Sequence, residues 1–334
     1  MSSPTIALAG AVDGQLLRAA GWQVRGSLAL TPYGHPADPA DLPSYPDLDA
    51  LLDDPGLDGV ALDAGDPLLA RHLPVLLAGG LHVLLTGPAP LEPDLLRAAR
   101  AVTGPGPART DDPGRPARAG LQPAEVVVGL QQRWEPWALT VAAALPLVGT
   151  PVVQATVRGW PRGGAAAAEL VDLARSWCGE VVAAVAAPAP LPAATLGDGL
   201  PVAWTLLHEG GATTLVSHQG FLPLARLSFA TARLEAGPLG ARWVDGAELR
   251  LREPADGRQH PRSTQEELAV RPPAPPSASY GLFGCAVALA EAVPHELVTH
   301  RWPWPADLGD LQAVGRVLEA LRTSARTQAP CRVG

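Results

Sequence analysis

The sequence predicts an α/β protein of two domains, in which a doubly wound parallel sheet precedes an α+β domain with an open, mostly antiparallel sheet. In the first part of the chain, short apolar runs alternate with segments of helical periodicity, as in a parallel sheet with crossover helices. From Val202 onward, apolar residues recur at every second position, which indicates antiparallel strands. The 334 residues also exceed the comfortable size of one hydrophobic core. We therefore expect one domain over residues 1–130 and another over residues 131–334.

The first domain is expected to repeat a strand followed by a helix. Gly10 closes the first apolar run, and glycines bound several of the later runs. The expected strands are residues 5–10, 24–30, 59–63, 82–85 and 126–130. The expected helices are residues 15–20, 48–52, 67–78 and 93–102. Residues 104–123 are rich in Gly, Pro and Arg, and we expect them to form an exposed loop.

The second domain is expected to open with helices and to continue as a sheet. Gly210 and Gly211 supply a turn between two of its expected strands. The expected strands are residues 152–157, 202–206, 213–217, 224–229 and 248–252. One expected helix begins beyond Trp134 and ends at Leu145. Two more cover residues 165–177 and 308–321. The proline-rich segment 272–276 is expected to be a stiff connector.

The basic residues of the chain exclude several classes of chemistry. All 25 of them are Arg, and the sequence contains no Lys. Schiff-base catalysis, pyridoxal phosphate attachment and a lysine general acid each need an amine that can lose its proton, and Arg stays charged. The formal net charge of −8 argues against nucleic-acid binding, which needs a clustered basic surface.

The apolar segments and the cysteines indicate a cytoplasmic protein without a metal. The longest apolar stretches, residues 73–85 and 181–194, are interrupted by Pro, Gly or His, so we expect no membrane span. No basic region precedes the first apolar run, so a secretory signal is not expected. Cys178, Cys285 and Cys331 are odd in number and far apart, and they fit no metal-ligand or redox spacing.

A family resemblance rests on the segment from Tyr45 to Ala101, which reads YPDLDALLDDPGLDGVALDAGDPLLARHLPVLLAGGLHVLLTGPAPLEPDLLRAARA. It resembles the Gfo/Idh/MocA oxidoreductase family, whose pattern here is a helix, a strand, a helix and then "aGkHVl.EKP". Further matches are Gln132-Arg133-Trp134 and the run from Asp172 to Glu180. The resemblance implies a Rossmann-like first domain that binds NAD or NADP, and hydride transfer assisted by the lysine of Glu-Lys-Pro. Here that motif is Thr86-Gly87-Pro88.

The cofactor side of the resemblance departs from the family at the phosphate loop. Val12 stands where the second glycine belongs, and Asp13 is a suitable N-cap whose carboxylate would repel a phosphate. No carboxylate lies near Thr31 to hold the ribose hydroxyls. These substitutions favour a structural turn over a working phosphate loop. The positions that the resemblance assigns to the cofactor are Gly10, Ala11, Val12, Asp13, Thr31, Ala64, Thr86 and Pro88.

The substrate side also lacks the family's groups. An Asp and a His one helical turn apart are expected in the family, and alignment on Asp172 puts Ala165 and Glu169 there. Glu169 could still act as an acid or base if it is buried, but we expect an exposed helix carboxylate. Arg133, Trp134 and Trp160 lie near the cleft that the resemblance implies. They could line a pocket for an anionic or sugar-like ligand.

Three functional hypotheses remain open from the sequence. The leading one is a degenerate member of the fold that binds a ligand or partner without catalysing the lysine-dependent reaction. The second is an active NAD(P)-dependent oxidoreductase acting on a sugar- or polyol-like substrate, with Glu169, His208 or His218 as the substitute acid. The third is a non-redox enzyme that reuses the cleft. We also expect a homo-oligomer joined through the sheet of the second domain, because the alternating segments imply a face that needs cover.

Overall fold

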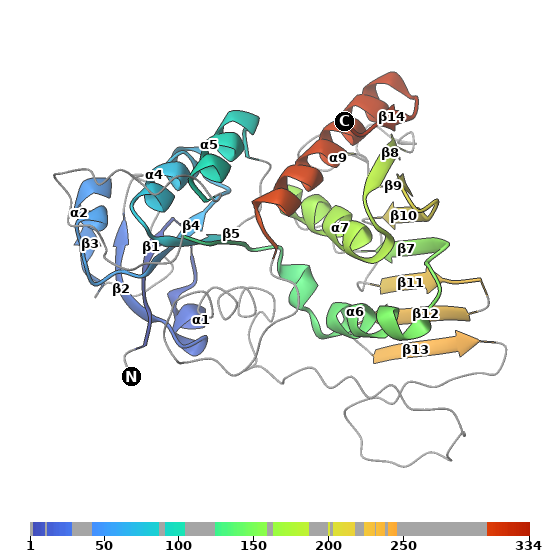
Figure 1. The fold of residues 1–334 in the computed structure, drawn as a ribbon, viewed down its shortest axis with the longest axis horizontal. Coiled ribbons are helices and arrows are strands. Elements are labelled where there is room, and N and C mark those ends of the chain that lie inside the picture. The colour runs from blue at the N-terminus through green and yellow to red at the C-terminus, as the bar shows by residue number, and fades with distance from the viewer. Residues whose placement is uncertain are drawn as a thin grey trace, which may run out of the picture. The chain divides into compact units, whose positions relative to one another are not determined.

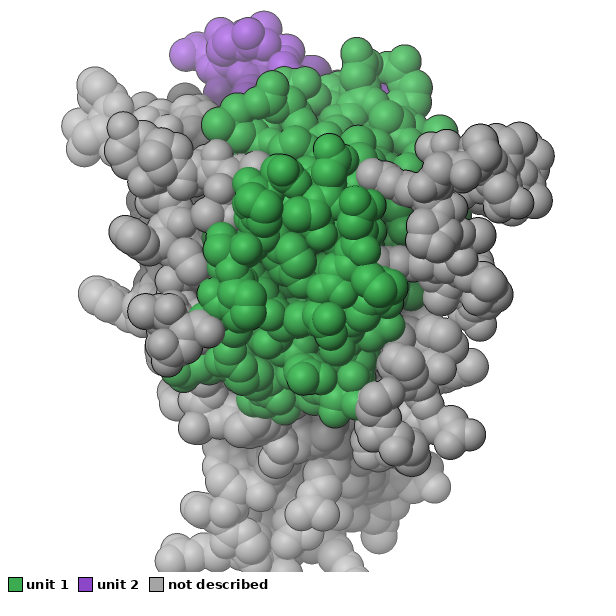
Figure 2. All heavy atoms as spheres, turned by 90° about the vertical axis from the view of Figure 1, so that its left-hand side faces the viewer, with its two compact units in different colours: residues 1–131, 275–312 green, residues 132–274, 313–334 purple. Residues whose placement is uncertain are grey.

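The computed structural model describes residues 3–10, 12–28, 42–86, 91–103, 124–158, 163–186, 200, 203–217, 224–230, 232–237, 240–245 and 306–334. The chain divides into two compact units, each gathered from two stretches of sequence. The first comprises Met1–Gln131 with Pro275–Gln312, and the second comprises Gln132–Ala274 with Ala313–Gly334. Figure 2 shows the first unit in green. Among the described residues, no helix is both long enough and apolar enough to cross a membrane.

The first unit contains a six-stranded parallel sheet in the order β3-β2-β1-β4-β5-β6 (Figure 1). Its strands are β1 (Thr5–Ala9), β2 (Gln23–Leu28), β3 (Ser44–Tyr45), β4 (Gly59–Asp63), β5 (His82–Thr86) and β6 (Val126–Val128). Its helices are α1 (Gly14–Ala19), α2 (Leu48–Leu52), α3 (Pro67–Ala70), α4 (Leu73–Ala78) and α5 (Pro93–Thr103). The central strands β1, β4 and β5 are buried almost throughout, which explains the apolar residues at their centres. This is the doubly wound sheet that the sequence predicts.

One predicted helix of the first unit is wrong. Residues 67–78 form two short helices, α3 and α4, instead of a single one. Pro74 lacks the N–H that would bind the carbonyl of Ala70, and its ring would clash with that carbonyl in a continuous helix. The first helix therefore ends at Ala70, and Pro74 takes a place in the first turn of α4, where the missing N–H is tolerated.

The second unit contains an eight-stranded sheet in the order β13-β12-β11-β7-β10-β9-β8-β14. Its strands are β7 (Gln154–Arg158), β8 (Val181–Ala186), β9 (Ala203–His208), β10 (Thr213–Ser217), β11 (Leu224–Ser228), β12 (Ala232–Gly237), β13 (Gly240–Asp245) and β14 (Cys331–Arg332). The helical elements are η1 (Gln131–Trp134), α6 (Pro136–Val148), α7 (Gly163–Cys178) and α9 (Leu308–Thr327). Only the β7–β10 pair is parallel among the described pairs of this sheet, so the sheet is mostly antiparallel, as predicted.

Helices cover one face of the eight-stranded sheet (Figure 1). Residues of α6, α7 and the later part of α9 join Trp204 and Leu206 of β9 in one hydrophobic core. The alternate residues of β9, Thr205 and Leu207, point to the opposite face, where Leu207 is 40% exposed. The expected loop at 104–123, the expected strand at 248–252 and the connector at 272–276 lie outside the described residues.

Candidate functional site

The carboxyl edge of the six-stranded sheet is the place where ligands bind in doubly wound folds, at the point where the strand order reverses. Here the reversal lies between β1 and β4. Gly10 follows β1 with a φ of +96°. A Cβ atom at Gly10 would lie 2.6 Å from both Asp63 Cβ and Leu69 Cδ1. Only glycine fits this position, because both the backbone conformation and the space exclude a side chain.

The loop after β1 turns its polar groups toward its own backbone. The Val12 N–H donates to the Gly10 carbonyl at 3.0 Å, and the Val12 side chain is 1% exposed. Asp13 is the N-cap of α1, and its Oδ1 accepts hydrogen bonds from the N–H groups of Gln15 at 3.0 Å and Leu16 at 3.2 Å. The predicted capping role of Asp13 is confirmed.

Two further aspartates at this edge bind backbone groups close to them in sequence. Asp63 ends β4, and its Oδ1 accepts a hydrogen bond from the Gly65 N–H at 2.9 Å. Asp66 is the N-cap of α3, and its Oδ1 accepts from the Leu68 N–H at 2.8 Å. Neither residue was singled out from the sequence. The signal was present for Asp66, since an aspartate directly before a proline is typical of a helix start.

Ala64 and Thr86, which the resemblance assigns to the cofactor, belong to the scaffold of the sheet edge. The Ala64 N–H donates to the Thr86 carbonyl at 2.8 Å, and Ala64 is 3% exposed. The buried Thr86 hydroxyl donates to the carbonyl of Leu62 at 3.3 Å. The remaining cofactor positions lie outside the described residues: Ala11, Thr31 and Pro88.

Two carboxylates of α7 hold consecutive residues of the η1 turn. Glu169 Oε2 accepts a hydrogen bond from the Gln132 N–H at 2.9 Å. Asp172, three residues further along α7, accepts from Arg133 Nε at 2.5 Å and from Arg133 Nη2 at 2.6 Å. The expectation that Glu169 is exposed is wrong, because its side of α7 packs inside the second unit and leaves it 9% exposed.

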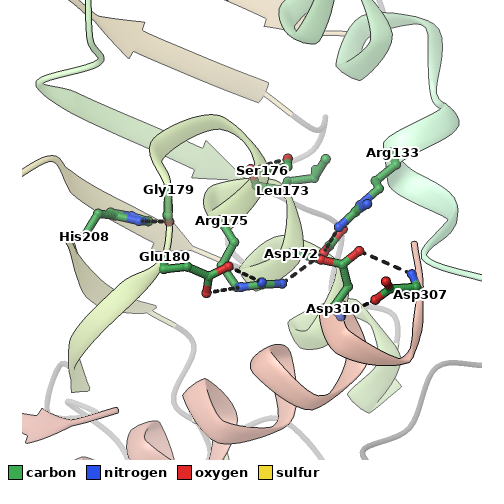
Figure 3. A network of polar contacts seen from close by, with 10 residues as sticks. All are labelled: Arg133, Asp172, Leu173, Arg175, Ser176, Gly179, Glu180, His208, Asp307 and Asp310. Atoms are coloured by element: carbon green, nitrogen blue, oxygen red, sulfur yellow. Dashed lines mark hydrogen bonds and ion pairs between the residues drawn. The ribbon is translucent and has the colours of Figure 1, made fainter. Parts of the chain in front are cut away.

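The ion pairs continue from Asp172 along α7 toward β8 (Figure 3). Arg175 Nη1 lies 3.6 Å from Asp172 Oδ1, and Arg175 Nη2 lies 2.5 Å from Glu180 Oε1. The side chains of Arg133, Asp172 and Arg175 are 10%, 1% and 6% exposed. Arg133, which the sequence suggested as a ligand contact, therefore has its guanidinium engaged by Asp172. Trp134 is the last residue of η1, and Trp160 lies outside the described residues.

His208, one of the substitute acids considered from the sequence, is held on both ring nitrogens. Nδ1 lies 2.6 Å from the Gly179 carbonyl (Figure 3), and Nε2 lies 2.8 Å from Thr214 Oγ1. Since the carbonyl can only accept, Nδ1 carries the proton and Nε2 accepts from the hydroxyl. Burial lowers the pKa of His208, although the Gly179 carbonyl raises it in part. His208 is thus a neutral, structural histidine, and His218 lies outside the described residues.

Cys178 lies beside this histidine. Its Sγ is 3.5 Å from Thr214 Oγ1, and burial raises the pKa of its thiol to about 11. The thiol is therefore protonated and unreactive at neutral pH. Among the described residues, no group of three or more His, Cys, Asp or Glu side chains could hold a metal ion.

These units define a fold class: the chain has the two-domain fold of the Gfo/Idh/MocA-type NAD-binding oxidoreductases, as the resemblance implied. No protein-family model matches the sequence, and no curated protein sequence matches it. The likeness is one of structure.

Three solved structures illustrate the likeness. An aldose-aldose oxidoreductase from Caulobacter crescentus, complexed with glycerol, has a TM-score of 0.67 and 17% identity, over 99% of this chain and 100% of that one. An NAD binding oxidoreductase from Klebsiella pneumoniae has a TM-score of 0.64 and 14% identity, over 100% of both chains. A levoglucosan dehydrogenase in complex with NADH and L-sorbose has a TM-score of 0.63 and 14% identity, over 99% of both chains.

Proposed function

We propose that this protein binds a sugar- or polyol-like ligand on an oxidoreductase scaffold and does not carry out lysine-dependent hydride transfer. The observation that carries the proposal is the contact of Glu169 with the Gln132 N–H at 2.9 Å. Glu169 occupies the position where the family resemblance places a histidine. A buried carboxylate that holds a backbone N–H has a structural role in the scaffold.

The lysine-free sequence supports the same proposal. The lysine of the family's Glu-Lys-Pro motif is replaced by Gly87. No other lysine exists in the chain to take its place, and an arginine keeps its proton at neutral pH. The group that takes the proton from the reacting hydroxyl, or returns it to the carbonyl oxygen in the reverse reaction, would have to be a residue of a different type.

The class of ligand is suggested by the structural neighbours. One neighbour is complexed with glycerol and another with L-sorbose, which are both polyhydroxylated molecules. The alternative is an active NAD(P)-dependent oxidoreductase with a modified site, and the burial of Glu169 is the observation that favours it. A buried carboxylate is a candidate for acid–base chemistry, whereas one that holds a backbone N–H is engaged in the scaffold.

We also propose that two copies associate through the exposed face of the eight-stranded sheet. Leu207 of β9 and Leu215 of β10 lie on this face, and they are 40% and 44% exposed. Thr205 faces Leu215 across the β9–β10 pair, and Thr213 faces Leu207. In a two-fold symmetric dimer, the same face of each copy would meet the other, so these exposed leucines would cover one another.

The proposed function is tested with the full chain and a panel of sugars and polyols. Each compound is incubated with the protein and NAD⁺ or NADP⁺, and the absorbance of the reduced nicotinamide is followed. The same panel is titrated without nucleotide while the melting temperature is recorded. We expect a saturable rise in melting temperature with at least one compound and no nicotinamide reduction with any. Turnover would overturn the proposal, and so would a panel without any thermal shift.

A further inference from the structure

We propose that the carboxyl edge of the six-stranded sheet has lost dinucleotide binding, because the loop after β1 has become a self-capped structural turn. This inference concerns the first unit alone and does not depend on the proposed function, which rests on Glu169 of the second unit. It departs from what the fold implies, since a neighbour of the same fold is a complex with NADH. Hydrogen-bond donors, space and charge at the loop each support it.

The hydrogen-bond donors of the loop already have acceptors within the chain. A dinucleotide is held through its diphosphate, which accepts hydrogen bonds from the backbone N–H groups of the loop and of the helix start. Here the Val12 N–H donates to Gly10, and the N–H groups of Gln15 and Leu16 donate to the Asp13 carboxylate. A diphosphate would have to break these contacts before it could accept from the same groups. Asp13 competes with the diphosphate for the N–H groups of Gln15 and Leu16, and it is always present because it is part of the chain.

The loop also lacks the glycine that gives a diphosphate space. The middle glycine of a phosphate loop lets the diphosphate approach the backbone closely. Val12 stands at that position, and its side chain is packed in the interior with 1% exposure. Asp63 and Leu69 pack so closely over Gly10 that even one added carbon there would lie 2.6 Å from both. The inward packing of Val12 stabilises this conformation of the loop, because turning the side chain outward would expose apolar surface to water.

The charge at this edge of the sheet is unfavourable for a diphosphate. Asp13, Asp63 and Asp66 bring three carboxylates to the loops that follow β1 and β4, on either side of the reversal in strand order. Their partners in the contacts described above are neutral backbone N–H groups, which do not cancel their charge. A diphosphate carries negative charge of its own, so its approach would be repelled. The short helices α1 and α3, of six and four residues, have capping carboxylates at their N-termini already.

The test is a calorimetric titration of the full chain with NADH and with NADPH. The first variant is Val12→Gly combined with Asp13→Ser, which frees space and removes a charge while Ser keeps a capping hydroxyl. The matched control is Asp47→Ser, because Asp47 caps α2 through the Ala50 N–H at 2.7 Å in the same unit. Val12→Ala with Asp13→Ser is the milder second variant, and thermal unfolding shows whether each variant is folded.

We expect no saturable binding of either nucleotide to the unaltered chain or to Asp47→Ser up to millimolar concentration. The folded double variant should bind at least about tenfold more tightly, a gain of roughly 1.4 kcal/mol. Saturable binding to the unaltered chain in the low micromolar range would overturn the inference. Failure of both folded double variants to gain affinity would also overturn it, because the loop would then not be the cause. Tight NADH binding without turnover of any sugar would contradict this inference alone and would leave the proposed function standing.

Discussion

Arg133 and Asp172 form a bidentate ion pair inside the second unit, with Nε–Oδ2 and Nη2–Oδ1 distances of 2.5 and 2.6 Å. Asp172 also lies 3.6 Å from Arg175, so one buried carboxylate faces two guanidinium groups. This pair joins the η1 turn to α7. The carboxylate that is most buried in the site is therefore part of the scaffold.

The Asp172→Asn substitution is predicted to destabilise the protein strongly. It removes the negative charge that faces Arg133 and Arg175, and breaking a buried ion pair costs about 3–5 kcal/mol. The free energy of unfolding from urea denaturation measures the loss. The control is Asp94→Asn, since the Asp94–Arg97 pair is 88% and 78% exposed and such pairs contribute about 0–1 kcal/mol. Equal effects of the two substitutions would contradict a scaffold role for Asp172.

Glu169 is predicted to respond to substitution as a hydrogen-bond acceptor. Glu169→Gln keeps an acceptor oxygen for the Gln132 N–H, so we expect a small loss of stability. Glu169→Ala leaves that N–H without its acceptor, which costs about 1–3 kcal/mol. Denaturant unfolding of both variants makes the comparison. If Glu169→Gln proved as damaging as Glu169→Ala, the negative charge of Glu169 and not its acceptor oxygen would be what matters.

His208 is predicted to make the stability fall at mildly acidic pH. Its pKa in the folded protein lies below the usual 6.5, mainly because of burial, so the unfolded chain binds the proton more tightly. The free energy of unfolding should therefore decrease as the pH drops below about 6.5. Above that pH, His208 should cause no pH dependence of the stability. Melting temperatures from about pH 5 to 8 should show a shallower dependence for His208→Gln.

His72 supplies the comparison for this pH dependence. Burial and Arg71 lower its pKa as well, so it contributes in the same direction from the first unit. The His72→Gln variant should retain the part of the pH dependence that comes from His208. A pH profile unchanged by His208→Gln would show that the histidine is not held in its neutral form.

The exposed sheet face is predicted to control the oligomeric state. Leu207→Arg or Leu215→Arg places a charge in the middle of the proposed interface, so either variant should be monomeric by light scattering while remaining folded. Leu68→Arg is the control, because Leu68 is 49% exposed on α3 of the first unit. An unaltered chain that is already monomeric at micromolar concentration would refute the proposed association.

Elements of the fold could be predicted from the sequence where a local pattern of residues determines them. Buried strands such as Gly59–Asp63 and His82–Thr86 are short apolar runs, and the cap at Asp13 is a local side-chain contact. Strand β12 (Ala232–Gly237) was not predicted, because Arg233 and Glu235 interrupt its apolar pattern. Glu235 Oε1 on β12 lies 2.9 Å from Arg226 Nε on β11, and this ion pair forms only because the two strands are paired.

The contacts of the candidate site were harder to predict because they join residues distant in sequence. Arg133 and Asp172 are 39 residues apart, and Glu169 and the Gln132 N–H are 37 apart. A carboxylate on a helix is exposed more often than not, which led to the wrong expectation for Glu169. Glu169 and Asp172 are buried because α7 packs inside the second unit, where both carboxylates meet the η1 turn.

The most direct test of the central claim is the activity of Gly87→Lys in the full chain, measured as nicotinamide reduction with NAD⁺ or NADP⁺ and a panel of sugars and polyols. The substitution returns the family's lysine and leaves Asp13 and Glu169 in their structural contacts. We predict no turnover, because a lysine acts only when the nicotinamide is already positioned, and positioning can account for roughly 7–11 kcal/mol of a barrier. Activity should require Val12→Gly with Asp13→Ser first, and Glu169→His in addition. NAD(P)-dependent turnover by Gly87→Lys alone would contradict the account, since the unaltered carboxyl edge of the six-stranded sheet would then already hold the cofactor.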